Sequence, residues 1–264
     1  MKRRLQSIIN NLIVGLKNYL PGVLAIVGLI IVWHILSVKS IVPSYMLPSP
    51  RDVVNALIED RQILLDHSLV TLTEAFYGLF IGIIIAFFMA TLMDECKSLY
   101  RAFYPIMVIT QTIPTIAIAP LLVLWMGFGM EPKITLVVLT TFFPIAVGLL
   151  DGYKSVDADS VKLLRSMGAG KIKIFFHVKF PNALSHFFAG LKISASYAIV
   201  GAVISEWLGG FEGLGVYMTR VKKAYAFDKM FAVIIVIIVI SLLLMKLINV
   251  LRKICMPWDK VKNK

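Results

Sequence analysis

Apolar residues are gathered along this chain into six long runs that are separated by shorter polar segments. A hydrocarbon core about 30 Å thick requires roughly 20 apolar residues in a helix, and the runs are close to that length. They predict an all-α integral membrane protein with six transmembrane helices, at about Leu20–Ser37, His67–Met93, Phe103–Trp125, Ile134–Leu150, Ala189–Leu208 and Met230–Leu251.

The third run contains three prolines, Pro105, Pro114 and Pro120. A proline removes one helical hydrogen bond, and neighbouring helices can satisfy the freed backbone group within a membrane protein. We therefore expect this helix to be kinked or broken. Two pairs of glycines four residues apart, Gly78 with Gly82 and Gly148 with Gly152, predict close contacts between helices.

The first 19 residues have a different pattern. Their apolar residues recur at helical spacing, which predicts a helix lying in the cytoplasmic membrane interface over 1–19. A cleavable signal peptide is the alternative, but the apolar residues form a stripe and no small-residue cleavage site follows. The six-helix domain then covers 20–251 and includes a cytoplasmic loop at 151–188, and 252–264 form a cytoplasmic tail. A short amphipathic helix is expected from about Pro50.

Composition and charge agree with a membrane protein. Of the 264 residues, 59% are hydrophobic and 16% charged, against about 25% charged in soluble domains. The net charge of +12 would suggest nucleic-acid binding in a soluble protein, but the basic residues cluster at the ends of the apolar runs, which argues against that class. Placing both termini inside puts nineteen of the 27 Lys and Arg residues on the cytoplasmic side, as the positive-inside rule requires. The basic group from Arg220 to Lys229 falls outside, against this trend.

The sequence shows no recognisable motif for catalysis or metal binding. Cys96 and Cys255 are far apart, the four histidines lack metal-ligand spacing, and no hydrolase or metalloprotease motif is present. The segment Gly168-Ala169-Gly170-Lys171 ends like a phosphate-binding loop, but Arg165 and Ile172 stand where that loop requires Gly and Ser or Thr. We expect no catalytic residue, metal site or cofactor in this chain.

The polar island Asp151–Pro181 is the most distinctive segment. Asp157 or Asp159 can cap a helix that begins near Ser160, and Gly168 can end it in a left-handed conformation. A second amphipathic stretch follows over Ile172–Val178, and Pro181 begins the return to the membrane. An ordinary surface helix-turn is the alternative to a docking helix.

The island resembles the cytoplasmic-loop signature of ABC importer permeases, Glu-Ala-Ala-x-x-x-Gly-x9-Ile-x-Leu-Pro. Gly168 and Pro181 are in register with it, whereas Lys162, Leu163 and Leu164 stand at the Glu-Ala-Ala positions and Phe180 replaces Leu. Over roughly 40–258 the chain is similar to the branch that serves nitrate, sulfonates, taurine and thiamine-pyrimidine precursors. The segments that carry this likeness are Leu47–Pro50, Gln111–Pro114, Phe142–Ile145, Gly190–Lys192 and Glu206–Gly210. Asp151-Gly152, Gly201–Val203 and Gly213–Met218 look most like the pyrimidine-precursor members.

The resemblance implies a permease subunit in the cell membrane. Two copies of the permease would form the pathway, two cytoplasmic ATPase subunits would hold ATP and Mg, and an extracytoplasmic binding protein would deliver a small molecule. The preferred substrate is a pyrimidine precursor of thiamine, and sulfonate, taurine, nitrate and riboflavin remain open. The island would be the coupling helix, with ATPase contacts at Asp159, Lys162, Leu163, Leu164, Arg165, Ser166, Met167, Gly168, Ala169 and Pro181. Lys162 replaces the family's carboxylate, so the partner ATPase is expected to carry an acid, or to lack a base, at that contact.

Ionisable residues within a membrane are costly and often functional, which draws attention to Glu74 and Glu206. Glu206 is a gate candidate, or alternatively a structural acid that bonds backbone amides around Gly209-Gly210. The candidates for lining the pathway are Gln111, Thr112, Pro114, Tyr197, Glu206 and Trp207. A stand-alone secondary carrier and a membrane-embedded hydrolase are the competing classes. The first lacks a visible inverted repeat and acid cluster, and the second lacks a nucleophile motif.

Overall fold

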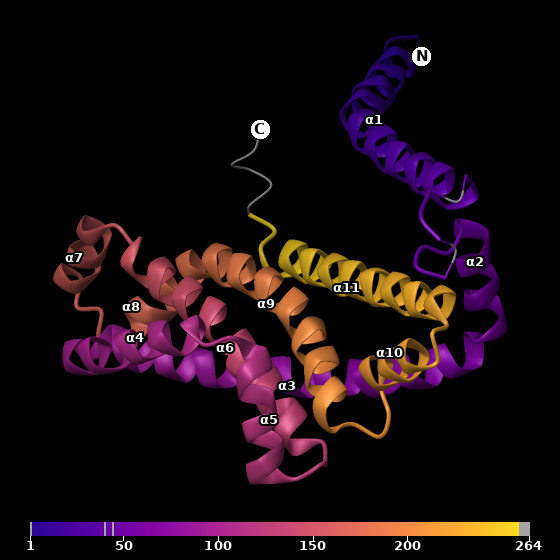
Figure 1. Cartoon of the computed structure of the whole chain (residues 1–264). Coiled ribbons are helices and arrows are strands. Elements are labelled where there is room, and N and C mark those ends of the chain that lie inside the picture. The colour runs from indigo at the N-terminus through magenta and orange to yellow at the C-terminus, as the bar shows by residue number, and fades with distance from the viewer. Residues whose placement is uncertain (1, 40, 44, 259–264) are drawn as a thin grey trace. The chain divides into compact units, whose positions relative to one another are not determined.

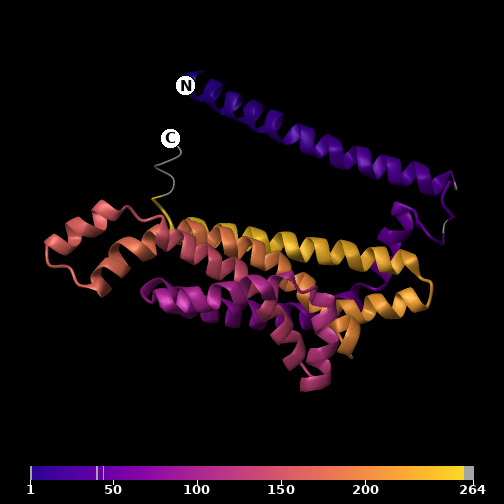
Figure 2. The same cartoon turned by 60° about the vertical axis from the view of Figure 1, so that its left-hand side comes forward.

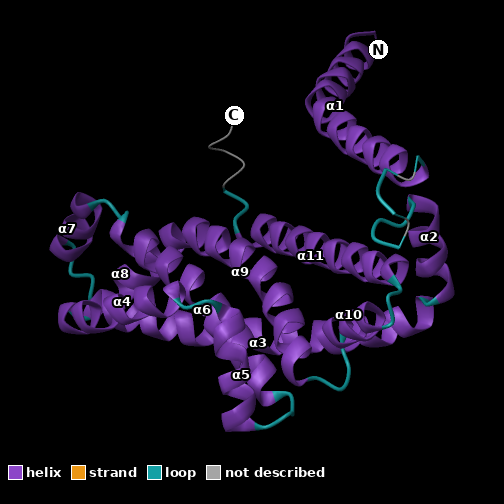
Figure 3. Cartoon of the chain, in the orientation of Figure 1, coloured by secondary structure: helices purple, strands orange, loops and turns teal. Residues whose placement is uncertain are grey.

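The computed structural model describes residues 2–39, 41–43 and 45–258, with side chains from residue 20 onward. All regular structure in this part of the chain is helical, as Figure 3 shows. The helices are α1 (Lys2–Val38), α2 (Pro50–Glu59), α3 (Arg61–Glu95), α4 (Lys97–Thr112), α5 (Thr115–Met126), α6 (Glu131–Lys154), α7 (Ala158–Ser166), α8 (Lys171–Ile174), the π-helical η1 (Phe175–Lys179), α9 (Phe180–Gly209), α10 (Leu214–Lys223) and α11 (Phe227–Cys255).

Five helical stretches are long and apolar enough to cross a membrane, and the bent pair α4–α5 brings the number to as many as six. The two members of that pair meet at 101°. The break lies at Ile113 and Pro114, where both residues have extended backbone angles. The predicted break in the third run is thus confirmed at Pro114, whereas Pro105 and Pro120 lie inside continuous helices.

The chain divides into two compact units. The smaller unit contains residues up to Arg61 together with Val221–Ala232. In it, α1 is a single helix that continues through Pro21, so no break separates the predicted interfacial helix over 1–19 from the first span. The location of 1–19 in the membrane interface stays a prediction, because the side chains of 2–19 are outside the described part.

The short helix expected from Pro50 is confirmed as α2. Ser49 caps it in a capping box with Asp52, and Pro50 occupies the first turn, where a missing N–H costs nothing. Within the same unit the Trp33 indole donates to the carbonyl of Pro48 at 2.9 Å. An ion pair between Lys229 and Asp60, 2.8 Å apart, ties α2 to the start of α11.

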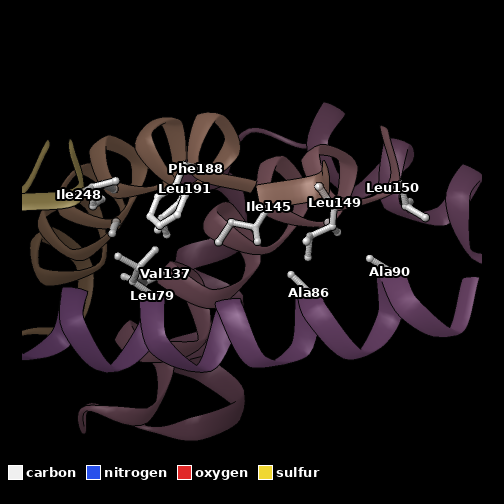
Figure 4. Close-up of a cluster of buried hydrophobic side chains, with 14 of the residues drawn as sticks. Leu79, Ala86, Ala90, Val137, Ile145, Leu149, Leu150, Phe188, Leu191 and Ile248 are labelled. Carbon is white, nitrogen blue, oxygen red and sulfur yellow. The ribbon is translucent and has the colours of Figure 1, made fainter. Parts of the chain in front are cut away.

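The larger unit comprises Gln62–Arg220 and the chain from Val233 onward. Its long helices α3, α6 and α9 run beside one another, with α7 at one end and the start of α10 at the other (Figures 1 and 2). Figure 4 shows the core between them, where apolar side chains of α3, α6 and α9 converge. Its fully buried members include Ala86, Ala90, Ile145 and Leu149.

Glycines let these helices approach closely. A Cβ at Gly82 on α3 would stand 2.5 Å from the hydroxyl oxygen of Thr141 on α6, and one at Gly148 on α6 would stand 2.7 Å from the backbone oxygen of His186 on α9. A Cβ at Gly152 would lie 2.6 Å from the Cα of Ala183. The close packing predicted from both glycine pairs is therefore confirmed.

The helices flanking the polar island extend into it. Within the loop predicted over 151–188, α6 continues to Lys154, and helix resumes at Lys171 and runs through η1 into α9. Helix propensity and the packing of Gly152 on Ala183 carry regular structure past the apolar runs. Only short turns, before α7 and after it, interrupt the helices.

Candidate functional site

The first candidate site is the short helix α7, which begins at the predicted cap. The Asp157 carboxylate accepts the backbone N–H groups of Asp159 and Ser160 at 3.2 and 3.1 Å, and the Ser160 hydroxyl at 2.9 Å. These bonds, first that from the Asp159 backbone, lower the pKa of Asp157 below its ordinary value, because they favour the charged carboxylate. Of the two caps proposed from sequence, Asp157 is the one present.

α7 ends at Gly168, as the sequence predicts. Gly168 has φ +80°, which glycine adopts without the steric penalty of a Cβ. The N–H of Ala169 bonds the carbonyl of Leu164, and that of Gly168 bonds the carbonyl of Arg165, both at 2.9 Å. This pair of bonds is the Schellman motif, and it turns the chain sharply back toward the membrane helices.

α7 presents its residues to the outside. None of its residues is buried, and the apolar side chains of Leu163 and Met167 are 62% and 74% exposed. Lys162 forms a 2.9 Å ion pair with Asp159, one turn earlier on the same helix. Contiguous exposed apolar patches mark interaction sites, whereas single exposed apolar residues are common. The exposure of Leu163 and Met167 therefore leaves both side chains available to a partner.

The base of the island is anchored to the long helices. Lys179, the last residue of η1, pairs with Asp94 near the end of α3, with 2.5 Å between Nζ and Oδ2. The Asn182 amide donates to the carbonyl of Gly152 at 3.1 Å and to the Ser155 hydroxyl at 2.8 Å. Pro181 lies in the first turn of α9, in agreement with its predicted place at the return.

The second candidate site is a buried polar cluster at the opposite end of the same helices. Glu206 on α9 is 1% exposed. Its carboxylate accepts the Thr71 hydroxyl of α3 and the N–H of Gly215, both at 2.6 Å. The Thr71 oxygen accepts the N–H of Leu214, and His67 Nδ1 accepts that of Gly213, both at 2.9 Å. The cluster thereby fixes the α9–α10 turn on α3.

Glu74 belongs to the same end of the bundle. It is fully buried on α3 and forms a 2.6 Å ion pair with Lys133 of α6. Its second carboxylate oxygen, Oε2, has no hydrogen-bond partner among the described residues. The pair lines a cavity of about 400 Å³, with Phe128 and Phe211 on its walls. Sequence reasoning identified Glu74 and Glu206 but missed Thr71, His67 and Lys133, for which no motif gives a signal.

The structure separates the pathway candidates into two groups. Gln111, Thr112 and Pro114 lie together at the exposed α4–α5 break, where the Gln111 amide donates to the carbonyl of Leu139 at 3.2 Å. Tyr197 and Trp207 are exposed on α9, whereas Glu206 is buried. The sequence offered a structural role for Glu206, in which its carboxylate bonds backbone amides around Gly209-Gly210. Glu206 does bond a backbone amide, but it is that of Gly215.

Within the described residues, no group of three or more His, Cys, Asp or Glu side chains could hold a metal ion.

Comparison with known proteins gives consistent results. Residues 78–257 match the family described as "Binding-protein-dependent transport system inner membrane component". The chain is 36% identical to the formylaminopyrimidine transport permease protein ThiX of Halalkalibacterium halodurans, over 88% of this chain and 93% of that protein. It is 28% identical to the taurine transport system permease protein TauC of Escherichia coli, over 90% of this chain and 88% of that protein.

The fold has a solved counterpart. An inward-facing structure of the MetNI methionine ABC transporter aligns with a TM-score of 0.66 at 19% identity, over 75% of this chain and 98% of that one. The family match covers most of the chain, including α7, Glu206 and the α9–α10 turn, whereas Thr71 and Glu74 lie before it. The chain therefore belongs to the family of binding-protein-dependent transport system inner membrane components, the permease subunits of ABC importers.

Proposed function

We propose that this permease imports an amino-pyrimidine precursor of thiamine, driven by a cytoplasmic ATPase that docks on α7. The observation that carries the docking role is α7 itself, a helix capped at both ends that leaves Leu163 and Met167 exposed. The name and 36% identity of the formylaminopyrimidine permease support the substrate class. Sulfonates, taurine, nitrate and riboflavin are the alternatives, and the taurine permease shows 28% identity.

The proposed topology has six spans with both termini in the cytoplasm. In this arrangement α4–α5 counts as one broken span, and α7 lies on the cytoplasmic side with Asp94 and Lys179. The surplus of basic residues on that side supports the orientation. The domain division proposed from sequence, 1–19, 20–251 and 252–264, is kept within it.

Coupling would work through α7 as a rigid element. Asp157 and Gly168 fix its two ends, so a groove on the ATPase could hold it in one orientation. The contacts are proposed at the ten coupling residues named from sequence, from Asp159 to Ala169 and at Pro181. Movement of the ATPase subunits would then shift the permease between two states, because α7 would make different contacts in each. ATP and Mg would be bound by the ATPase, and this chain would hold no cofactor.

The pathway would form between two copies of this chain, and an extracytoplasmic binding protein would deliver the substrate. The exposed candidates Gln111, Thr112 and Pro114 at the α4–α5 break, together with Tyr197 and Trp207 on α9, are available for such a pathway. Because Glu206 is buried and bonded to Thr71 and Gly215, we propose a structural role for it rather than direct contact with substrate.

The test is reconstitution in proteoliposomes with a candidate ATPase and a candidate binding protein from the same organism. We expect uptake of labelled formylaminopyrimidine that requires ATP and the binding protein. Saturating taurine, riboflavin or nitrate should compete little. Competition by one of these compounds would identify it as the substrate and would leave the proposed ATP-driven import unchanged. Uptake by the chain alone, driven by an ion gradient, would instead identify a secondary carrier.

A further inference from the structure

α3 connects the two candidate sites of the larger unit. It is one continuous helix over Arg61–Glu95 with no proline. Near its start, Thr71 and Glu74 bond the buried cluster. At its end, Asp94 and Glu95 form ion pairs with the segment that follows α7. An unbroken helix held at both ends can transmit a displacement along its axis.

The two ion pairs at the α7 end differ in their surroundings. The pair Lys179–Asp94 has side chains that are 22% and 12% exposed, whereas Lys171–Glu95 has 78% and 40%. Exposed ion pairs contribute little because water screens them and both side chains lose freedom. Breaking a largely buried pair leaves an uncompensated charge, which costs much more. Lys179–Asp94 is therefore the stronger of the two ion pairs between these segments.

Aromatic side chains lie beside this ion pair. The ring of Phe87 on α3 meets the edges of Phe180 and Phe175 at centroid distances of 5.9 and 6.5 Å. Tyr153, at the end of α6, lies 5.6 Å from Phe175 and shares a 3.2 Å hydrogen bond with Thr91 of α3. Movement of η1 would therefore also push on apolar surface of α3.

Lys179 is part of a π-helical turn. Five residues, Phe175–Lys179, form η1 between the α-helical segments α8 and α9. A π-turn inserts extra backbone into a helix and is frequent at functional sites. It marks the place where the segment after α7 joins a membrane helix, and Lys179 is its last residue.

We propose that the Lys179–Asp94 ion pair is a positioning contact that transmits movement of α7 to α3, and through α3 to the cluster at Thr71, Glu74 and Glu206. The inference rests on the proposed function, since it requires an ATPase that moves α7. Neither residue needs to contact ATP, substrate or the ATPase. Loss of the pair would separate ATP hydrolysis from transport.

The experiment uses the whole transporter in proteoliposomes. Lys179→Met and Asp94→Asn each remove one charge, and the exchange Lys179→Asp with Asp94→Lys restores the pair in reverse. Lys171→Met and Glu95→Gln are matched controls that break the exposed pair between the same segments. Four quantities are measured for each: ATPase co-purification, basal ATP hydrolysis, molecules transported per ATP, and the unfolding temperature.

We expect Lys179→Met and Asp94→Asn to lower the transport-to-ATP ratio about five-fold or more, the lower end of typical coupling effects, while the ATPase still co-purifies and hydrolyses ATP. The exchange should recover much of the ratio, and the controls should stay within about two-fold of the native chain. An unchanged ratio in the first two variants would overturn the inference. A fall in transport and hydrolysis together, with a lower unfolding temperature, would reduce the pair to a structural role and overturn it as well. If no ATPase co-purifies with the native chain, the proposed function itself fails.

Discussion

The two ends of the larger unit differ in how deeply their polar residues are buried. At the α10 end, Glu74, Lys133 and Glu206 are buried and bonded to backbone or to one another. On α7 itself, Asp159 and Lys162 form an ion pair on the surface, and the less exposed pair Lys179–Asp94 lies at the base of the island. Buried polar networks are costly to break and hold a structure in place. Under the proposed function, the α10 end maintains the fold and the α7 end makes contacts with a partner.

The largest effect is expected from breaking the buried ion pair. Lys133→Met would leave the Glu74 carboxylate buried without its partner, which costs about 3–5 kcal/mol of stability. The measurement is thermal unfolding of the purified chain in detergent. The double variant Lys133→Met with Glu74→Gln is the control, because it removes both charges and should recover part of the loss. Equal stability of the single variant and the native chain would contradict the contrast between the two ends.

Gly168→Val should act on coupling instead of on the core. Its left-handed backbone would cost a residue with a Cβ about 1–2 kcal/mol, and a β-branched side chain resists it further. Apart from the adjacent residues, no heavy atom of the described part of the chain lies within 4 Å of a Cβ at Gly168 or at Gly170, and Gly170 has φ −72°. Gly170→Val is thus a control with the same open space and ordinary backbone angles. We expect transport per ATP to fall several-fold for Gly168→Val alone. Equal transport per ATP in both variants would show that coupling does not need the left-handed turn at Gly168.

Lys162→Glu should have a smaller effect. The Lys162–Asp159 pair is exposed, and such pairs contribute about 0–1 kcal/mol, so the unfolding temperature should hardly change. ATPase binding should weaken, because the substitution would present a carboxylate where the partner ATPase is expected to carry an acid or to lack a base. Lys162→Gln separates loss of the positive charge from gain of a negative one. Unchanged assembly and transport with the native ATPase would show that this position makes no charged contact.

The smallest effect concerns pH at the start of α7. Since the pKa of Asp157 is lowered in the folded chain, its contribution is complete above the ordinary pKa of Asp and is lost as the pH falls through the lowered value. The protection of the α7 amides against hydrogen exchange, taken as the ratio of the intrinsic to the observed rate at each pH, should therefore decrease over that acidic range. Asp157→Asn keeps a capping side chain without titrating, so its protection should stay constant over the same range; the same decrease in both chains would assign it to another group.

Local signals made the α7 end predictable from sequence. Its features depend on residues that are neighbours in the chain, namely the cap at Asp157 and the turn at Gly168. The same holds elsewhere for the helix from Pro50 and the break at Pro114. The α10 cluster could not be predicted, because Thr71 and Glu206 are 135 positions apart and Glu74 and Lys133 are 59 apart. Only the cost of burying an acid drew attention to Glu74 and Glu206. Their partners are set by helix packing.

The central claim, that α7 is the contact with an ATPase, is tested most directly by site-specific cross-linking. Cys96 and Cys255 are exposed and would first be replaced by serine. A single cysteine is then introduced at Met167, the residue directly after α7, or, as the control, at Phe211 near the start of α10; these native side chains are 74% and 73% exposed. With the native ATPase present, a short bifunctional reagent should link position 167 to the ATPase and leave position 211 unlinked. Linkage at 211, or none at 167 in a complex that hydrolyses ATP and transports, would contradict the account.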